Sequence, residues 1–139
     1  MAGSFSDRVL VEPYVEGREM TVAVLGDEAL PVVEIAPESG FYDYESKYQK
    51  GATEYTCPAE IGEALADDLT RQALKAFRVL GCRGYARVDF RVTTDGAPTC
   101  LEVNTVPGMT ETSLVPMAAL AHGLDFGRLV ERIASLALK

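Results

Sequence analysis

Two acidic residues on either side of a predicted β-turn are the residues of this chain best placed to do chemistry. Asp95-Gly96 separates two runs in which apolar and polar residues alternate, a strong signal for a β-hairpin with a two-residue turn. In that register Asp89 lies directly opposite Glu102, and Arg87 lies directly opposite Asn104. Because successive side chains of a strand point to opposite faces, all four groups are predicted on one face of the hairpin.

This arrangement predicts a site for a divalent cation. Two carboxylates that face each other across a ladder repel, and a hard cation such as Mg²⁺ or Mn²⁺ between Asp89 and Glu102 relieves that repulsion. Asn104 offers a further oxygen ligand, and Arg87 is placed beside the metal to meet negative charge on whatever the metal carries. The opposite face of the hairpin is predicted to be core, and it carries Val88, Phe90, Val92, Leu101 and Val103.

A simpler interpretation of the acid pair is a polar sheet face turned to water, which is common in antiparallel sheets. A register shift of one residue would separate the four groups. In favour of a site, the second strand runs into Thr105–Thr110, a turn-rich segment (Thr-Val-Pro-Gly-Met-Thr) that is able to aim backbone N–H groups back at the acids.

Composition sets limits on the function. The 139 residues are the length of one domain, and the formal charge of −8 with no basic stripe argues against nucleic acid as a partner. It does not argue against a nucleotide, because a metal ion can bridge acidic protein groups to phosphates. Three cysteines without CxxC spacing are typical of a reducing compartment. No signal peptide or membrane span is evident, so we expect a cytoplasmic protein that does not bind membranes.

The order of the predicted elements gives an α+β class with a mostly antiparallel sheet and packing helices. Short strands are predicted at residues 9–12, 19–25, 30–35 and 54–57. An amphipathic helix is predicted from Pro58 to Leu80, ended by Gly81, with an inner face of Ile61, Leu65, Leu69, Ala73, Phe77 and Leu80. Two helices follow the hairpin, at residues 113–121 with His122 as a C-terminal cap, and after Asp125. The inner face of the last helix is predicted to be Phe126, Leu129, Val130, Ile133 and Ala137.

A long segment at about residues 36–54 has neither helical nor strand periodicity. Its four aromatic residues in positions 41–48 make disorder a poor description. Two interpretations stay open. The segment is either a surface loop held down by its own aromatics, or a lid whose Lys47 and Tyr48 reach a substrate on closure.

Several stretches, in order along nearly the whole chain, resemble the D-alanine–D-alanine ligase family of the ATP-grasp superfamily. They are Glu12–Thr21, Phe41–Tyr48, Cys57–Ala59, Leu80–Asp89, Leu101–Thr110 and Ser113–Ala119. The resemblance implies an ATP-grasp C-terminal domain at residues 9–139, with residues 1–8 an N-terminal extension or expression remnant and residues 36–54 an omega-loop lid. It also implies ATP as co-substrate and formation of D-alanyl-D-alanine for peptidoglycan.

The resemblance further assigns roles to single residues. Asp89, Glu102 and Asn104 match the family's magnesium ligands. Arg87 and the backbone N–H of Gly108 match the groups that stabilise the oxyanion when the acyl phosphate is attacked. The remaining matches are Glu12 and Glu19 (adenine and ribose hydroxyls), Lys47 and Tyr48 (lid), and Ser113 and Leu114 (carboxylate of the second D-alanine). Relatives that make D-alanyl-D-lactate tend to have histidine at Tyr48, so the dipeptide is expected here.

Two departures from the family pattern lead to alternatives. Pro13 stands where the family often has lysine next to the adenine, and no counterpart of the N-terminal domain or of most of the central domain is present. We therefore expect those domains as partners in an intact homodimeric enzyme. The alternatives are a folded domain without activity of its own, which binds Mg²⁺ or nucleotide weakly or serves assembly, and an ATP-grasp ligase with another acceptor.

Overall fold

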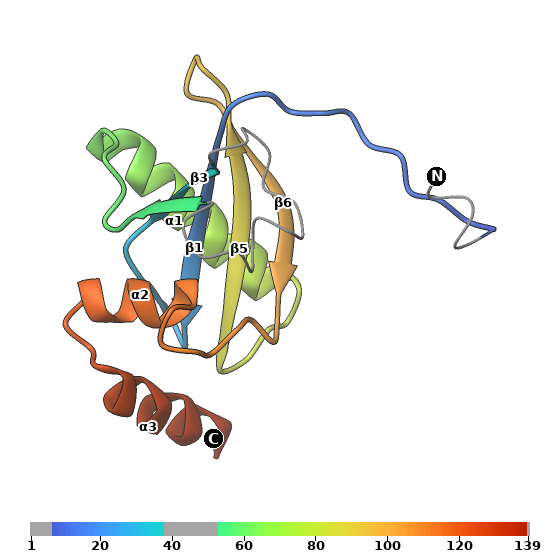
Figure 1. The fold of residues 1–139 in the computed structure, drawn as a ribbon. Helices are drawn as coiled ribbons and strands as arrows, with labels where there is room; N and C mark the ends of the chain where they lie inside the picture. Colours follow the sequence, from blue (N-terminus) through green and yellow to red (C-terminus); the bar gives the residue numbers. More distant parts are fainter. Residues whose placement is uncertain (1–6, 38–52, 139) are drawn as a thin grey trace.

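A twisted antiparallel sheet forms the centre of the molecule, with helices on both faces (Figure 1). This is a computed structural model, and it describes residues 7–37 and 53–138. The strands are β1 (Arg18–Leu25), β2 (Glu28–Ala29), β3 (Val33–Pro37), β4 (Thr53–Thr56), β5 (Tyr85–Val92) and β6 (Pro98–Asn104). The helices are α1 (Glu63–Val79), α2 (Leu114–Ala121) and α3 (Phe126–Ala137). The predicted α+β class is confirmed.

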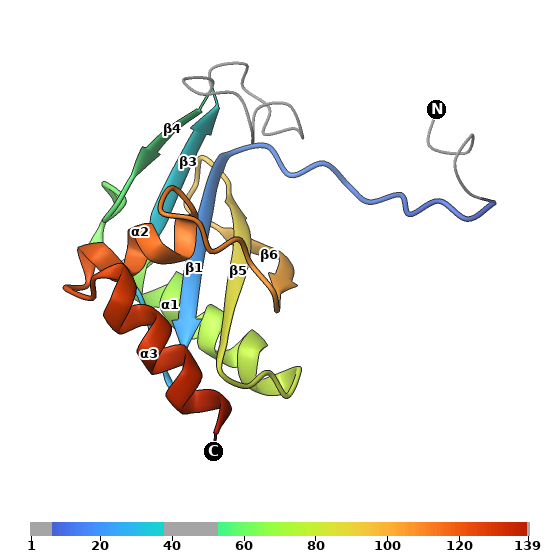
Figure 2. The ribbon, with the colours of Figure 1, turned by 60° about the horizontal axis from the view of Figure 1, so that its bottom comes forward.

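The strand order is β4-β3-β1-β5-β6, and β2 also pairs with β1. All of these pairings are antiparallel. Helix α1 covers one face of the sheet, where Leu69, Ala73 and Phe77 pack against apolar side chains of β1 and β5. Helices α2 and α3 lie on the other face (Figure 2), over Ala23 and Leu25 of β1. The chain therefore has two apolar cores with the sheet between them.

The predicted first strand, residues 9–12, is wrong. Residues 7–16 contain no strand or helix and extend away from the sheet (Figure 1), and Leu10 and Val11 are more than four-fifths exposed. The sheet begins at Arg18, where β1 pairs with β5 on one side and β3 on the other. No position beside β1 is therefore left for residues 9–12.

The β5–β6 hairpin has the predicted pairing at its functional end but not at its turn. Three residues, 94–96, form the loop: the Thr93 N–H donates to the Ala97 carbonyl at 3.1 Å, and Gly96 has φ +86°. Val92 therefore pairs with Pro98, one residue out of the predicted register. A β-bulge between Asp89 and Phe90 restores the predicted register. Asp89 therefore pairs with Glu102, and Arg87 with Asn104, as predicted.

The bulge accounts for a wrong core assignment. Val88, Phe90 and Val92 are buried as predicted, and Val103 packs against the same core. Leu101 was predicted beside them, but it is the extra residue of the bulge and is 48% exposed. A bulge leaves one residue without a partner across the ladder and redirects its side chain.

Helix α1 begins at Glu63, five residues after the predicted start. The Cys57–Pro58 peptide is cis, and the Ala59 N–H donates to the carbonyl of Val32 at 2.8 Å. The backbone of this segment is therefore bonded to the connection before β3 and does not enter the helix. The predicted end is confirmed by Gly81, with φ +66°, although the side chain of Leu80 is exposed.

The two C-terminal helices begin and end close to their predicted positions. Asp125 caps α3 by accepting from the Arg128 N–H at 2.9 Å, and His122 is the C-cap of α2. The inner face of α3 is narrower than predicted. Leu129 is buried and Ile133 packs beside it, whereas Phe126, Val130 and Ala137 are exposed. Among the described residues, no helix is long and apolar enough to cross a membrane.

Candidate functional site

One face of the sheet changes from apolar to polar along β1. Ala23 and Leu25 are buried under α2 and α3, and the same face continues as Thr21 and Glu19 beyond that core. The antiparallel register places Asp89 beside Thr21 on β5, and Glu102 beside Asp89 on β6. Strand alternation thus assembles a polar row on three neighbouring strands.

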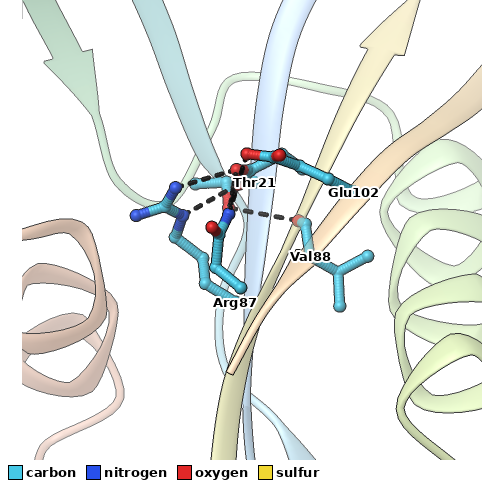
Figure 3. Close-up of polar contacts among 6 residues, drawn as sticks. Thr21, Arg87, Val88 and Glu102 are labelled. Carbon is cyan, nitrogen blue, oxygen red and sulfur yellow. Dashed lines mark hydrogen bonds and ion pairs between the residues drawn. The ribbon is translucent and has the colours of Figure 1, made fainter. Parts of the chain in front are cut away.

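Asp89 is the centre of this row, and Figure 3 shows its partners Thr21 and Arg87 together with Glu102. The Asp89 carboxylate accepts from Arg87 Nε and Nη2, both at 2.8 Å, and from Thr21 Oγ1 at 2.6 Å. The Arg87 and Asp89 side chains are only 17% and 13% exposed, so this is a largely buried bidentate ion pair. Arg87 is predicted from the sequence to lie beside a metal and to meet negative charge on the metal's ligand. In the structure Arg87 is bonded to Asp89 itself.

Asn104 joins the two acids across the hairpin. Its Nδ2 donates to Asp89 Oδ2 at 2.8 Å and to Glu102 Oε1 at 3.0 Å. A group with partial positive charge therefore lies between the two carboxylates, where the sequence analysis expected a cation. Rotation of the amide by half a turn would present its oxygen instead, which gives two carboxylates and one amide oxygen.

This set of donors fits a hard divalent cation. Carboxylate and amide oxygens are the ligands that Mg²⁺ and Ca²⁺ prefer, and Mg²⁺ usually takes only one or two protein carboxylates and fills its other positions with water and phosphate. Within the described part of the chain, no group of three or more His, Cys, Asp or Glu side chains is arranged to hold a metal. The site would thus be incomplete without oxygen ligands from a substrate.

A cavity of about 430 Å³ lies next to the acids. That volume is within the usual range for small-molecule sites. Its wall is formed by the N-terminal segment, β1, β3 and the β5–β6 hairpin, and it is part polar and part apolar. The lining residues are Glu12, Pro13, Val15, Glu19, Ile35, Arg87, Asp89, Thr99, Cys100, Leu101 and Glu102. Five of the predicted site residues, Glu12, Glu19, Arg87, Asp89 and Glu102, thus line the same cavity.

Leu101 is one of the apolar residues of the cavity wall. The bulge that removes Leu101 from the core places it in the cavity wall, where Val15 and Ile35 are further apolar residues. Simple alternation of side chains assigns Leu101 to the core face, so this position could not be predicted from the residue pattern.

Three other predicted site residues lie together at the start of α2. A Cβ added at Gly108 would be 2.9 Å from Ser113 Oγ, so the backbone of Gly108 lies directly beside that hydroxyl. Ser113 Oγ accepts from the Thr110 N–H at 3.0 Å, which folds the turn onto the helix start. Leu114, the first residue of α2, is 8% exposed and belongs to the core between the sheet and the C-terminal helices. None of the three lines the cavity of the acids.

Two predicted site residues, Lys47 and Tyr48, lie outside the described residues. Of the predicted lid at 36–54, both ends belong to the sheet: Ala36 pairs with Glu54, and Pro37 with Thr53. Thr21 is the residue that the sequence analysis missed. It is the buried polar residue of the described core, 1% exposed. A threonine two positions after Glu19 on the same strand face was the available signal.

Replacing Thr21 with valine tests the bond to Asp89. The hydroxyl has one proton, and Asp89 Oδ1 at 2.6 Å is a closer acceptor than the Val88 carbonyl at 3.1 Å. Valine has nearly the same shape but no donor, so we expect Thr21→Val to lower the free energy of unfolding by about 1–2 kcal/mol. Urea denaturation measures this. Thr21→Ser keeps the hydroxyl and should lower the free energy of unfolding by less than Thr21→Val does. An equal decrease in both variants would contradict the role of the hydroxyl.

Cys100 allows a second test at the same site. Burial, together with the negative charge of Asp89, raises the pKa of the Cys100 thiol above its ordinary value. The raised pKa keeps the thiol protonated to higher pH, so the reactive thiolate is scarcer near pH 8 than in the unfolded chain. We expect iodoacetamide to label Cys100 more slowly in the folded chain than in urea, as followed by mass spectrometry. Asp89→Asn should speed the labelling, and an unchanged rate would show that Asp89 does not act on the thiol.

Comparisons with known proteins agree with this geometry. A sequence model of the family described as D-ala D-ala ligase C-terminus matches residues 1–135. The chain is 53% identical over 132 residues to a D-alanine–D-alanine ligase of Pseudoalteromonas translucida, and this alignment covers 95% of the chain and 43% of the relative. For the ligase of Alcanivorax borkumensis the identity is 54% over 138 residues, with 99% and 45% covered. The chain therefore spans less than half the length of these curated relatives.

Solved structures give the same result. The D-alanine–D-alanine ligase of Bacillus anthracis, complexed with ATP, superimposes with a TM-score of 0.76 at 35% identity and covers 90% of this chain and 41% of its own. A D-Ala:D-Ser ligase of Enterococcus faecalis gives a TM-score of 0.76 at 33% identity, with 88% and 37% covered. The sequence match and the shared fold show that this chain belongs to the D-alanine–D-alanine ligase C-terminal family.

Proposed function

We propose that this chain is the C-terminal ATP-grasp portion of a D-alanine–D-alanine ligase, and that its cavity holds the nucleotide with its phosphates toward Asp89 and Glu102. The observation that carries the proposal is the bonded group Arg87–Asp89–Asn104–Glu102 at the wall of a cavity of about 430 Å³. It supplies a cation site and a positive group at the same end of one cavity.

In this proposal the rest of the cavity wall binds the nucleoside. Leu101, Val15 and Ile35 offer apolar surface for a base, and Glu12 and Glu19 offer acceptors for ribose hydroxyls or a base amino group. Pro13 lies in the same wall. It has no N–H and no positive charge, so contacts at this position are limited to packing and its carbonyl.

Asp89, Glu102 and Asn104 would hold the divalent cation. When bound, Mg²⁺ would neutralise charge on the phosphate oxygens during transfer. Arg87 is held by Asp89 and lines the cavity, so its guanidinium is fixed next to the place where negative charge develops. Preorganised donors of this kind contribute about 3 kcal/mol each to stabilising a transition state.

The reaction that we propose for the whole protein has two steps. The γ-phosphoryl group of ATP moves to a carboxylate oxygen of the first D-alanine, which leaves ADP and an acyl phosphate. The amine of the second D-alanine then forms the C–N bond, loses a proton, and phosphate leaves as the C–O bond breaks. Ser113, the backbone N–H of Gly108 and the backbone of Leu114, together at the start of α2, are proposed to hold the second D-alanine.

Other expectations remain predictions. Lys47 and Tyr48 are proposed to close over phosphate and substrate. The homodimer, the partner domains and the cytoplasmic location are also expectations that follow from the family. Mn²⁺ is proposed as a substitute for Mg²⁺ because it also accepts carboxylate and carbonyl oxygens.

The acceptor of the acyl group distinguishes ligases that share this fold. The chain matches a D-alanine–D-alanine ligase and a D-Ala:D-Ser ligase with the same TM-score, so the fold does not separate the two. We expect D-alanine, on the basis of Tyr48. Assays of the intact parent protein with D-alanine, D-serine and D-lactate decide this, and a clear preference for another acceptor would correct the proposed substrate but not the proposed reaction class.

The 139 residues alone are expected to bind MgATP more weakly than micromolar and to show no turnover. The relatives contain more than half of their length outside the match, and we propose that further phosphate contacts come from that part. Calorimetric titration of the chain with MgATP measures the affinity. Micromolar binding would contradict a nucleotide site that is shared with another domain.

A further inference from the structure

We propose that Arg91 is a positioning residue that anchors the N-terminal segment, residues 12–17, over the nucleotide cavity. The link to nucleotide rests on the proposed function, but the anchor itself does not. Arg91 Nη1 donates to the Gly17 carbonyl at 2.8 Å, and Nη2 donates to Tyr14 Oη at 3.0 Å. The Arg91 guanidinium carbon also lies 5.3 Å from the centre of the Tyr14 ring.

The anchored segment forms one wall of the cavity without belonging to the sheet. Glu12, Pro13 and Val15 line the cavity, whereas β1 begins only at Arg18. Residues 7–14 are exposed, including Val9, Leu10 and Val11, so side-chain packing does little to fix that end of the segment. The bonds from Arg91 to Tyr14 and Gly17 are therefore contacts that tie this wall to the sheet.

Gly17 lies where the N-terminal segment leaves the sheet. It has φ +150°, and a Cβ at this position would be 2.0 Å from the carbonyl oxygen of Val92. The chain thus crosses directly against the end of β5, next to Arg91. The close crossing sets where the segment leaves the sheet, and the two bonds from Arg91 set the direction in which it continues.

Arg91 suits this role because of where its own strand holds it. It lies between the buried residues Phe90 and Val92 and pairs with Glu19 on β1 and Thr99 on β6. Its backbone is therefore in the interior of the sheet, and its side chain continues the row of Arg87 and Asp89. Arg91 does not line the cavity. Any effect on a ligand must act through the segment.

Backbone ¹⁵N relaxation of the ligand-free chain tests the anchor. We expect Arg91→Ala to lower the order parameters of Tyr14, Val15 and Glu16 from the range of ordered backbone, about 0.85, to that of flexible backbone, below about 0.6, with β1 and β5 unchanged. Arg91→Lys keeps the charge but cannot serve both acceptors with a planar fork, so its order parameters should lie between those of wild type and alanine. Arg83→Ala, at an exposed loop position, is the matched control and should leave the order parameters unchanged.

Unchanged order parameters at residues 14–16 in Arg91→Ala would overturn the anchor. A second arm uses NMR titration with MgATP, which detects weak binding. A weaker affinity in Arg91→Ala than in Arg83→Ala supports the link to the cavity, and equal affinities would overturn that link. Absence of MgATP binding to the wild-type chain would count against the proposed nucleotide site, while the relaxation result still decides whether Arg91 holds the segment.

Discussion

Asp89→Asn in the intact ligase is expected to reduce ligation by about a thousandfold or more while the fold persists. The substitution removes the charge that the cation site needs and replaces the carboxylate that Arg87 bonds with a neutral amide. A loss of about 4 kcal/mol of transition-state stabilisation corresponds to that factor. The cost to folding should be smaller, about 1–3 kcal/mol, because an amide can still accept from Arg87 and Thr21. Phosphate release under saturating ATP and D-alanine measures the first effect, and urea denaturation measures the second.

The matched control is Asp67→Asn, which changes an exposed acid on α1, on the opposite face of the sheet. It should leave both ligation and stability close to wild type. Near-normal turnover by Asp89→Asn would contradict the assignment of Asp89 to the cation site. Both measurements are made on the same preparation, so that a loss of folded protein is not mistaken for a loss of ligation.

Gly17→Ala is expected to have the largest effect on stability, lowering the free energy of unfolding by about 3 kcal/mol or more. The added methyl group would meet the Val92 carbonyl oxygen at 2.0 Å, and φ +150° is a conformation that residues with a side chain rarely adopt. Such backbone strain costs about 1–3 kcal/mol by itself, and the clash adds to it because the contact is with backbone rather than with a side chain that can move. Urea denaturation of the two proteins measures the difference.

Gly96→Ala separates the two causes. Gly96 also has a positive φ, +86°, but a Cβ there would meet nothing within 4 Å. Gly96→Ala should therefore lower the free energy of unfolding only by the cost of the backbone strain, about 1–2 kcal/mol. An equal decrease in the free energy of unfolding for Gly17→Ala and Gly96→Ala would show that the close crossing of the chain against β5 is not important for folding. It would then contradict the proposed role of Gly17 in setting where the N-terminal segment leaves the sheet.

In the β5–β6 hairpin, the strand pairing could be predicted from the sequence, but the turn length and the bulge could not. Alternation and the Asp95-Gly96 pair predict two antiparallel strands with Asp89 opposite Glu102, and the structure has this pairing. The turn, however, has three loop residues, and the bulge at Leu101 supplies a compensating residue. The correct pairing at the acids thus results from two single-residue shifts that cancel. Periodicity alone cannot detect a bulge, because the extra residue changes no residue type.

The residues that sequence reasoning missed depend on contacts between distant elements. Thr21 became part of the site because β1 lies beside β5, a pairing of strands more than sixty residues apart. The segment around Glu12 was predicted as a strand from its apolar residues, yet the sheet has no free position beside β1. Local propensity favoured a strand there, and the strand order excluded it.

The helices were easier to predict because their signals are local. The Asp125 cap and the glycine after α1 act within one turn of the helix, and the structure has both. The late start of α1 was missed because the bond from Ala59 to Val32 joins segments far apart in the sequence.

The claim on which the proposed function depends is that Asp89 and Glu102 bind one divalent cation together. Anomalous scattering from crystals of the chain soaked with MnCl₂ and ATP tests this most directly. One manganese peak within ligand distance of a carboxylate oxygen of each acid, with the oxygen of Asn104 turned toward it, is the predicted result. A peak that contacts only one of the two acids, or a site elsewhere with Asn104 still bridging the carboxylates, would contradict the claim.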